Sequence, residues 1–462
     1  MIRSVLISVL LLSFSAFSGS AQADEFDDVP RPGQNGELKS AIKDTVKAKQ
    51  KHWGSEFKTA RRWFDDEAVG GHEIKLLSDG KTLHRQRLSM IAQAKRSIYV
   101  SAFSFKPDNT GSEIISALCM KAREGLDVRL MTDAFGSPKL RDDRLAIRDC
   151  GIKFMVYNPT QWGVEKYWYN LHEKLFIVDG RTVLTGGSGF SDLYLKASST
   201  SNAWYDLDVR IDGPAACLLH DVYIENWKLS QREDELSYSR DALDPSEMSA
   251  ELNEYLYGDG RFTTCSAEPS SPPAGKSRVA AVYNNPRFSD KRPILAKYIA
   301  AGMFAKKKIK IYAPYIVPHK DFVDLLELAV LHGVDVSIIT NSRRSSDERA
   351  VVVYAVYKNA VELISRGVKV YMWSGTSTMH RKAGIYDGLA FIGTDNQDIR
   401  GQRYSSEDVV FTDDPKIVSE LEGQFDADLK KCQRLTLKQA KKIRGQYSGF
   451  TRWLSGLLEE FM

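Results

Sequence analysis

Two stretches of the chain repeat the same order of apolar and amphipathic segments. In the first stretch, the short apolar runs 97–103, 128–131 and 152–157 predict buried strands, and residues 112–124 carry apolar positions at helical spacing. Gly125 supplies a stop for this helix. Strand, helix and strand in this order predict an α/β fold with a largely parallel sheet.

The second stretch follows the same path. Residues 305–312 correspond to the first strand, 321–332 to the helix, 333–339 to the second strand and 366–371 to the third. An internal repeat of this length predicts two related domains. We therefore expect a pseudo-two-fold pair of mixed, largely parallel sheets flanked by helices.

Each repeat also contains the pattern H-x-K-x(4)-D-G. The first copy supplies His172, Lys174 and Asp179, and the second supplies His380, Lys382 and Asp387. A histidine and a lysine two positions apart on an extended segment point to the same face. Both copies are followed by a short apolar run and a turn of small residues, at 182–189 and 389–396. The chance of two such copies with matching flanks is about one per cent or less.

This doubled motif resembles the signature of the phospholipase D superfamily. Three further segments, 206–214, 313–318 and 339–342, are similar to the bacterial cardiolipin synthases, in particular those of the C type. The resemblance runs from about Lys75 to the C-terminus. It implies an enzyme of phospholipid metabolism whose substrate is a phospholipid phosphodiester.

Two imidazoles and two lysines in one pocket suit chemistry at such a phosphodiester. One imidazole can attack phosphorus to give a phosphohistidine, while the other protonates the leaving alkoxide. Lys174 and Lys382 would stabilise the non-bridging oxygens. The residues themselves do not distinguish the two histidines, but the resemblance implies that His172 is the nucleophile and His380 the acid and base. This chemistry needs no metal or other cofactor, and we expect none.

The resemblance also assigns supporting residues. Asp206 and Glu407 match the acids that orient the two histidines, and the motif residues Asp179 and Asp387 are expected to hold the geometry between strand and turn. The family pattern G-G/S-x-N after each motif implies phosphate-binding side chains, for which we expect Ser188, Thr394 and Asn396. The first copy departs from this pattern, because Gly189 stands where an asparagine is expected. The second departs at Arg400-Gly401, where the family often has Arg-Ser.

Composition adds little to this assignment. The chain has 462 residues, of which 43% are hydrophobic and 27% charged, as in ordinary globular proteins. Its formal net charge of +4 does not by itself indicate a nucleic-acid partner. The 5 cysteines leave at least one thiol unpaired. Cys119 lies in an apolar run at helical spacing, and we interpret it as a core thiol.

The N-terminus predicts export. Residues 1–23 have a basic start, an apolar run and the sequence Ala21-Gln-Ala23, which together form a signal peptide with a cleavage site. An uncleaved anchor is the alternative. Export is compatible with two locations, the periplasm and the outside of the cell. In either place the protein could lie peripherally on a membrane.

The expected domains are a lead-in at 24–73, repeat 1 at 74–232, a linker at 233–284, repeat 2 at 285–433 and a basic amphipathic tail at 434–462.

Two segments have open interpretations. The tail carries lysines and arginines followed by apolar residues at helical spacing, so it either lies on an anionic membrane surface or docks on its own domain. Residues 161–169 are rich in aromatic side chains, which either pack under a loop or line the mouth of the pocket.

Four functions fit the sequence. The leading hypothesis is an exported phosphatidyltransferase of cardiolipin-synthase type, and the nearest alternative is a phospholipase D that uses water as acceptor. A secreted metal-independent nuclease is disfavoured, because family nucleases of this kind are typically short, with one motif per chain. An inactive lipid-binding protein is disfavoured by the two intact motifs. The sequence leaves the oligomeric state and the lipid donor and acceptor open.

Overall fold

A computed structural model describes residues 62–158, 168–195, 204–238, 261–265, 275–287, 289, 291–375 and 377–462. The predicted signal peptide and most of the predicted linker lie outside these residues. The predicted lead-in is described only from residue 62, and the aromatic segment 161–169 only from residue 168.

The first repeat alternates strands and helices. A short helix, α4 (Trp63–Glu67), precedes it. Helices α5 and α6 begin where Asp79 and Asp108 accept hydrogen bonds from the backbone N–H groups of the first turn. The elements in chain order are β1 (Val69–Leu77), α5 (Gly80–Gln93), β2 (Ser97–Ala102), α6 (Asn109–Arg123), β3 (Asp127–Asp133), α7 (Pro138–Asp142), α8 (Arg144–Asp149), β4 (Lys153–Tyr157), β5 (Asn170–Leu171), β6 (Phe176–Val178), β7 (Thr182–Gly186), α10 (Asp192–Leu195), β8 (Asp208–Asp212) and α11 (Ala215–Tyr238).

The second repeat has the same order, and a C-terminal segment follows it. Its elements are β9 (Ser277–Asn284), α13 (Pro293–Phe304), β10 (Lys308–Tyr312), α14 (Lys320–Leu331), β11 (Asp335–Asn341), α15 (Ala350–Ser365), β12 (Lys369–Trp373), β13 (Ala383–Tyr386), β14 (Leu389–Gly393), α16 (Ile399–Tyr404), β15 (Ser405–Thr412) and α17 (Pro415–Leu429). The C-terminal segment consists of β16 (Cys432–Arg434), α18 (Leu437–Gly445), α19 (Gly449–Leu458) and the 3-10 turn η3 (Glu459–Phe461). The α/β fold and the internal repeat are thus confirmed.

The strands form one mixed sheet rather than two separate ones. Its order is β16-β12-β11-β10-β13-β14-β15-β9-β1-β8-β7-β6-β2-β3-β4, and β5 pairs with β15 outside this path. Along the path, parallel pairing is confined to β2-β3-β4 and β10-β11-β12, which are joined through helices. This corrects the expectation of largely parallel sheets. The strands after each motif are antiparallel because tight turns connect β6 to β7 and β13 to β14.

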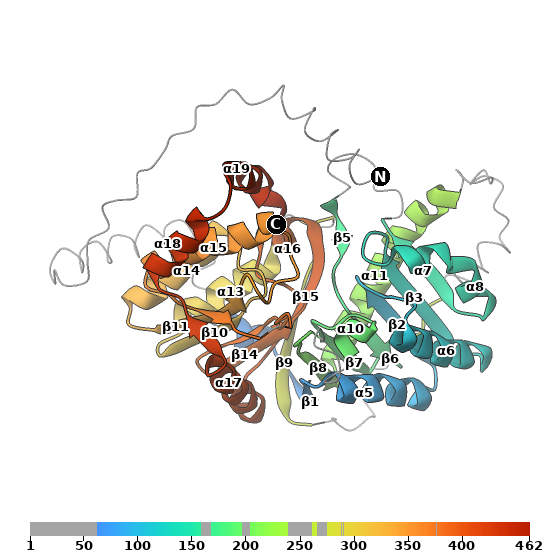
Figure 1. Ribbon diagram of the computed structural model, residues 1–462. Helices are drawn as coiled ribbons and strands as arrows, with labels where there is room; N and C mark the ends of the chain where they lie inside the picture. The colour runs from blue at the N-terminus through green and yellow to red at the C-terminus, as the bar shows by residue number, and fades with distance from the viewer. Residues whose placement is uncertain are drawn as a thin grey trace. The chain divides into compact units, whose positions relative to one another are not determined.

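Strands β1 and β9 join the two halves of the sheet. The first residues of β1 pair with β9, and its later residues pair with β8. In Figure 1 these strands lie between the blue-to-green first repeat and the yellow-to-red second repeat. Two predicted boundaries are therefore corrected. Residues 277–284 form β9 rather than linker, and residues 69–73 belong to β1 rather than to the lead-in.

Three clusters of apolar side chains stabilise this arrangement. One lies within the first repeat under α5 and α6, and another lies within the second repeat under α13, α14 and α15. The third contains side chains of both repeats, including Trp227 of α11 and Phe425 of α17. Because this inner core is shared, neither repeat buries its apolar surface alone, and the two repeats fold as one unit.

The C-terminal tail docks on the second repeat. Leu435, Ala440 and Tyr447 are buried in the same core as α15. Lys358 of α15 also forms an ion pair with Glu459. Of the two alternatives for the tail, the structure supports docking on its own domain. In the described part of the chain, no helix combines the length and the apolar character that a membrane span requires.

Four of the cysteines form two disulfides. Cys119 pairs with Cys150, and Cys217 pairs with Cys265, with Cα atoms 5.4 Å apart in each pair. Cys432 remains a thiol. The interpretation of Cys119 as a core thiol was wrong, because the end of α8 brings Cys150 against α6.

We expect Cys119→Ser to lower the free energy of unfolding by about 2–4 kcal/mol, because the disulfide closes a loop in the unfolded chain. The measurement is urea unfolding under oxidising conditions. Cys432→Ser is the matched control and should change the stability by less than about 1 kcal/mol. Equal stability of the Cys119→Ser variant and the wild type would contradict the disulfide.

Candidate active site

The two motifs lie at corresponding places in the two repeats. His172 and Lys174 fall between β5 and β6, and His380 and Lys382 immediately precede β13. These positions are extended but outside the regular strands. All four residues are largely buried: the His172 side chain is 14% exposed and that of His380 is 6% exposed.

Each histidine is hydrogen-bonded to an acid of the other repeat. Nδ1 of His172 lies 2.7 Å from Oε1 of Glu407, and Nδ1 of His380 lies 2.7 Å from Oδ2 of Asp206. The sequence suggests the two acids by their comparable places within each repeat, but the hydrogen bonds cross between repeats. A carboxylate at Nδ1 fixes the neutral tautomer that leaves Nε2 free to react.

The local backbone brings each acid to its histidine. A Cβ atom on Gly187 would lie 1.9 Å from Oδ1 of Asp206, so this carboxylate can approach only a glycine. The backbone N–H of Leu207 donates to the same oxygen at 2.9 Å. In the other repeat, the Thr394 hydroxyl donates to Oε2 of Glu407. In each carboxylate, one oxygen is thus hydrogen-bonded to a histidine, and the other accepts a hydrogen bond from a second donor.

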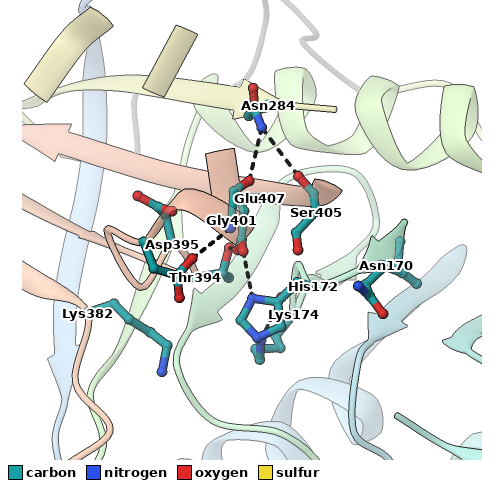
Figure 2. A network of polar contacts seen from close by, with 12 residues as sticks. Asn170, His172, Lys174, Asn284, Lys382, Thr394, Asp395, Gly401, Ser405 and Glu407 are labelled. Carbon is teal, nitrogen blue, oxygen red and sulfur yellow. Dashed lines mark hydrogen bonds and ion pairs between the residues drawn. The ribbon is translucent and has the colours of Figure 1, made fainter. Parts of the chain in front are cut away.

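The lysines lie beside the histidines. Nζ of Lys174 donates to the carbonyl oxygen of His172, and Nζ of Lys382 donates to that of His380 at 2.7 Å. Burial lowers the pKa of Lys174, and it lowers the pKa of Lys382 to about 7. Figure 2 shows Lys382 from the second repeat near the His172–Glu407 pair and Lys174.

The electrostatics indicate one shared pocket. Burial, followed by the charges of Lys174 and Lys382, holds the pKa of His172 well below its usual value. Burial and the charge of Lys382 lower the pKa of His380 to about 4. Both imidazoles are therefore neutral at pH 7. Since each histidine is hydrogen-bonded to an acid of the other repeat and its pKa is affected by both lysines, the two motifs meet in one place, as the doubled pattern predicts.

The two acids differ in their ionisation. Burial raises the pKa of Glu407 to about 7, although Lys174 and the Thr394 hydroxyl act in the opposite direction. Burial also opposes ionisation of Asp206, but the neighbouring His380 and Lys382 outweigh it and lower the pKa. Asp206 is thus a carboxylate at neutral pH, whereas Glu407 is partly protonated at that pH. An arriving phosphodiester would bring a negative charge that raises the pKa of both imidazoles.

Aromatic rings flank the histidines. The centroid of the Trp204 ring lies 4.5 Å from that of His380, and Tyr194 and Tyr315 lie 5.8 and 6.1 Å away. Phe103 lies 5.1 Å from His172. These rings limit contact of the imidazoles with water. Tyr315 falls in one of the segments that carry the family resemblance, but no sequence pattern marks the other three aromatic residues.

The expected phosphate contacts need a correction. The Ser188 hydroxyl donates to Asp208, and the Thr394 hydroxyl donates to Glu407, so both are occupied by carboxylates. Neither hydroxyl is available to phosphate in this arrangement. Asn396 is partly exposed and stays a prediction. A side chain at Gly189 would meet the carbonyl oxygen of Ser104 at 2.7 Å, so the asparagine expected there would not fit.

The motif aspartates do not contact the histidines. Asp179 accepts hydrogen bonds from the backbone N–H groups of residues 95–97, and Asp387 accepts them from those of residues 306–308. Both aspartates have positive φ, 53° and 52°. This geometry agrees with a role in the turn between strands and places neither carboxylate at the reacting atoms.

The sequence did not predict several residues that support the site. Arg87 is buried and donates to the carbonyl oxygens of Ser188 and Gly189 at 2.9 and 2.8 Å. Asp408 of the second repeat accepts a hydrogen bond from Thr185 of the first at 2.6 Å. Asn284, at the end of β9, donates to the carbonyl oxygens of Gly401 and Ser405 near Glu407 (Figure 2). Their partners are remote in sequence, so no local pattern marks them.

Among the residues that the structure describes, no group of three or more histidine, cysteine, aspartate or glutamate side chains is arranged to hold a metal ion. Lys174, Lys382 and Arg400 contribute positive charges that act on His172.

Comparison with known proteins identifies relatives of this site and fold. A family profile described as "Cardiolipin synthase, PLD-like domain" matches residues 88–225 and 299–429. The cardiolipin synthase of Oceanobacillus iheyensis is 28% identical over 379 residues, which cover 81% of this chain and 72% of that protein. Cardiolipin synthase 1 of Bacillus cereus is 27% identical over 391 residues, covering 83% of this chain and 72% of that protein.

A solved structure supports the fold assignment. The phosphatidylserine synthase of Haemophilus influenzae superposes with a TM-score of 0.64 and 17% sequence identity, covering 88% of this chain and all of that one. Assignment to the C-type branch stays a prediction. Because the family profile matches both repeats and more than half of the residues, the chain belongs to the cardiolipin synthase, PLD-like domain family of the phospholipase D superfamily.

Proposed function

We propose that the protein transfers a phosphatidyl group from a phospholipid to an alcohol through a phosphohistidine, as a cardiolipin synthase does. The observation that carries the proposal is the pair of crossed hydrogen bonds, His172 with Glu407 and His380 with Asp206. These hydrogen bonds orient two imidazoles at one site that also contains two lysines. One imidazole can then act as the nucleophile and the other as the acid and base. The cardiolipin synthases among the relatives support a phospholipid as the substrate.

In the first half-reaction, Nε2 of His172 attacks the phosphorus atom. The phosphorus–oxygen bond to the headgroup alcohol breaks, and His380 donates its proton to the leaving oxygen. The family resemblance assigns these two roles to the two histidines. The lysines of both motifs offset the charge on the non-bridging oxygens. His380 must be protonated for this step, which the negative charge of the bound phosphodiester favours.

In the second half-reaction, His380 accepts the proton of the incoming hydroxyl. The hydroxyl oxygen attacks phosphorus, the phosphorus–nitrogen bond breaks and His172 is restored. Water in place of the alcohol would give phosphatidic acid, which is the hydrolytic alternative. Burial of both imidazoles and the aromatic rings around them limit the access of water, and this supports transfer.

We also propose that the protein works outside the cytoplasm. The signal peptide predicted at residues 1–23 supports export. The two disulfides support it independently, because such bonds persist in oxidising compartments. A membrane lipid as substrate would require contact with a membrane surface, for which the C-terminal tail is the proposed segment.

The direct test uses the purified protein with vesicles of phosphatidylglycerol and phosphatidylethanolamine. We expect cardiolipin and a released headgroup alcohol by mass spectrometry, both absent with His172→Ala. Phosphatidic acid as the sole product would establish the phospholipase instead. Cleavage of a nucleic acid without any lipid product would contradict the lipid assignment.

The covalent step can be tested separately. We expect His172→Ala and His380→Ala to lower kcat by at least about a thousandfold each. In His380→Ala, the intermediate should accumulate because the incoming hydroxyl has no base. Rapid acid quench and peptide mass spectrometry should locate the phosphatidyl group on His172. Its appearance on the other histidine in the reciprocal variant alone would reverse the two roles.

The pKa of Lys382 gives a prediction for pH. Because this pKa is lowered to about 7, Lys382 loses its positive charge as the pH rises through that value. We therefore expect kcat/KM to fall more steeply above about pH 7 than below it in the wild type. In Lys382→Arg the guanidinium keeps its charge, so this alkaline decline should move upward or disappear, even if the overall activity is lower. An unchanged alkaline decline would assign it to another group.

A further inference from the structure

Helix α19 has an apolar face that its own domain leaves uncovered. Phe450, Trp453 and Leu457 recur at intervals of three and four residues and therefore share one side of the helix. Their exposed fractions are 65%, 49% and 43%. The rings of Phe450 and Trp453 lie 5.9 Å apart, so these side chains form a continuous patch.

The other side of the tail packs on the second repeat, and this packing determines where the patch faces. Ser455 of α19 is buried, and α19 packs on α15. Tyr447, between α18 and α19, lies in the core of the second repeat. The patch on α19 is consequently held facing outward, because the same helix is docked on its other side.

The segment that carries the patch is basic. Residues 437–458 contain Lys438, Lys441, Lys442, Arg444 and Arg452 and no acidic residue. Lys438, Lys441, Lys442 and Arg452 are exposed, and none of the five forms an ion pair with another described residue. An exposed apolar patch on a basic segment whose cations form no ion pair with the described residues matches the interface of an anionic bilayer, where aromatic rings enter the headgroup region and lysines meet the phosphates.

The tail also reaches the segments that carry one histidine–acid pair. Phe461 of η3 stacks on Trp168, with ring centroids 4.5 Å apart, and on Tyr404 at 5.6 Å. The backbone N–H of Arg400 donates to the carbonyl oxygen of Met462 at 2.8 Å. Trp168 lies just before His172 in the chain, and Tyr404 ends the helix before Glu407. Figure 1 shows α19 and the C-terminus beside α16.

We propose that the outward face of α18 and α19 is a docking surface for an anionic membrane. Phe450, Trp453 and Leu457 enter the interface, and the lysines and arginines of residues 437–458 bind its phosphates. The two interpretations of the tail then hold together, because it docks on its own domain and presents its other side to lipid. The contacts of η3 connect this segment to those that carry His172 and Glu407. The proposal goes beyond the proposed reaction, since docking needs no turnover.

Sedimentation with vesicles tests the proposal. The full chain carries His172→Ala so that no lipid is consumed, and the triple variant adds Phe450→Ser, Trp453→Ser and Leu457→Ser. The control variant instead adds Met120→Ser, Leu145→Ser and Leu218→Ser, whose residues are 59%, 61% and 48% exposed on other helices. Both variants keep residues 1–61, so any contribution of that segment is the same in each.

On phosphatidylglycerol vesicles we expect the triple variant to bind at least about tenfold more weakly than its parent, and the control to bind within about twofold of it. The parent should bind phosphatidylcholine vesicles much more weakly. Lys441→Gln with Lys442→Gln should weaken binding to phosphatidylglycerol by roughly fivefold or more. Circular dichroism should show the same fold for all variants.

Equal binding by the triple and control variants would overturn the proposal. Equal binding of the parent to both kinds of vesicle would overturn its electrostatic part. A dimer of the parent that the triple variant alone dissociates, together with unchanged vesicle binding, would make this face an interface between copies of the chain. None of these outcomes depends on catalysis, so a failed lipid-transfer assay would be a separate result.

Discussion

The site depends on two hydrogen bonds that cross between the repeats. Glu407 orients His172 and Asp206 orients His380, so neither repeat contains a complete histidine–acid pair. The shared inner core between α11 and α17 and the continuous sheet through β1 and β9 hold the repeats in the register that these bonds require. The catalytic unit is therefore the whole described fold, and separation of the repeats would disrupt both pairs at once.

Burial determines how these groups are charged. Burial disfavours the charged form of each of these groups, so the pKa values of the histidines and Lys382 fall while that of Glu407 rises. Both imidazoles are consequently neutral at pH 7. In the proposed reaction the negative charge of the phosphodiester raises the pKa of His380, so that substrate binding and protonation of this imidazole favour each other.

The C-terminal tail connects this pocket with the surface. Its inner side completes the core of the second repeat, and its last residues pack against the segments before His172 and Glu407. Its outer side is apolar and cationic. A single segment therefore contributes to folding, contacts the segments that precede His172 and Glu407, and offers the surface that we assign to the membrane.

The sequence alone determined the family and the α/β fold class, and it predicted the chemistry. Its periodicity predicted the α/β repeats, and the doubled motif identified the histidines and lysines, because these signals are local and recur within one chain. Only the tertiary structure decided which acid serves which histidine, since sequence distance does not report contacts across a shared core. It also showed that Ser188 and Thr394 support carboxylates and that Gly189 leaves no room for a side chain. The predicted domain boundaries missed parts of strands β1 and β9. These strands belong to the sheet because they pair with strands that are remote in sequence, and local composition does not reveal such pairing.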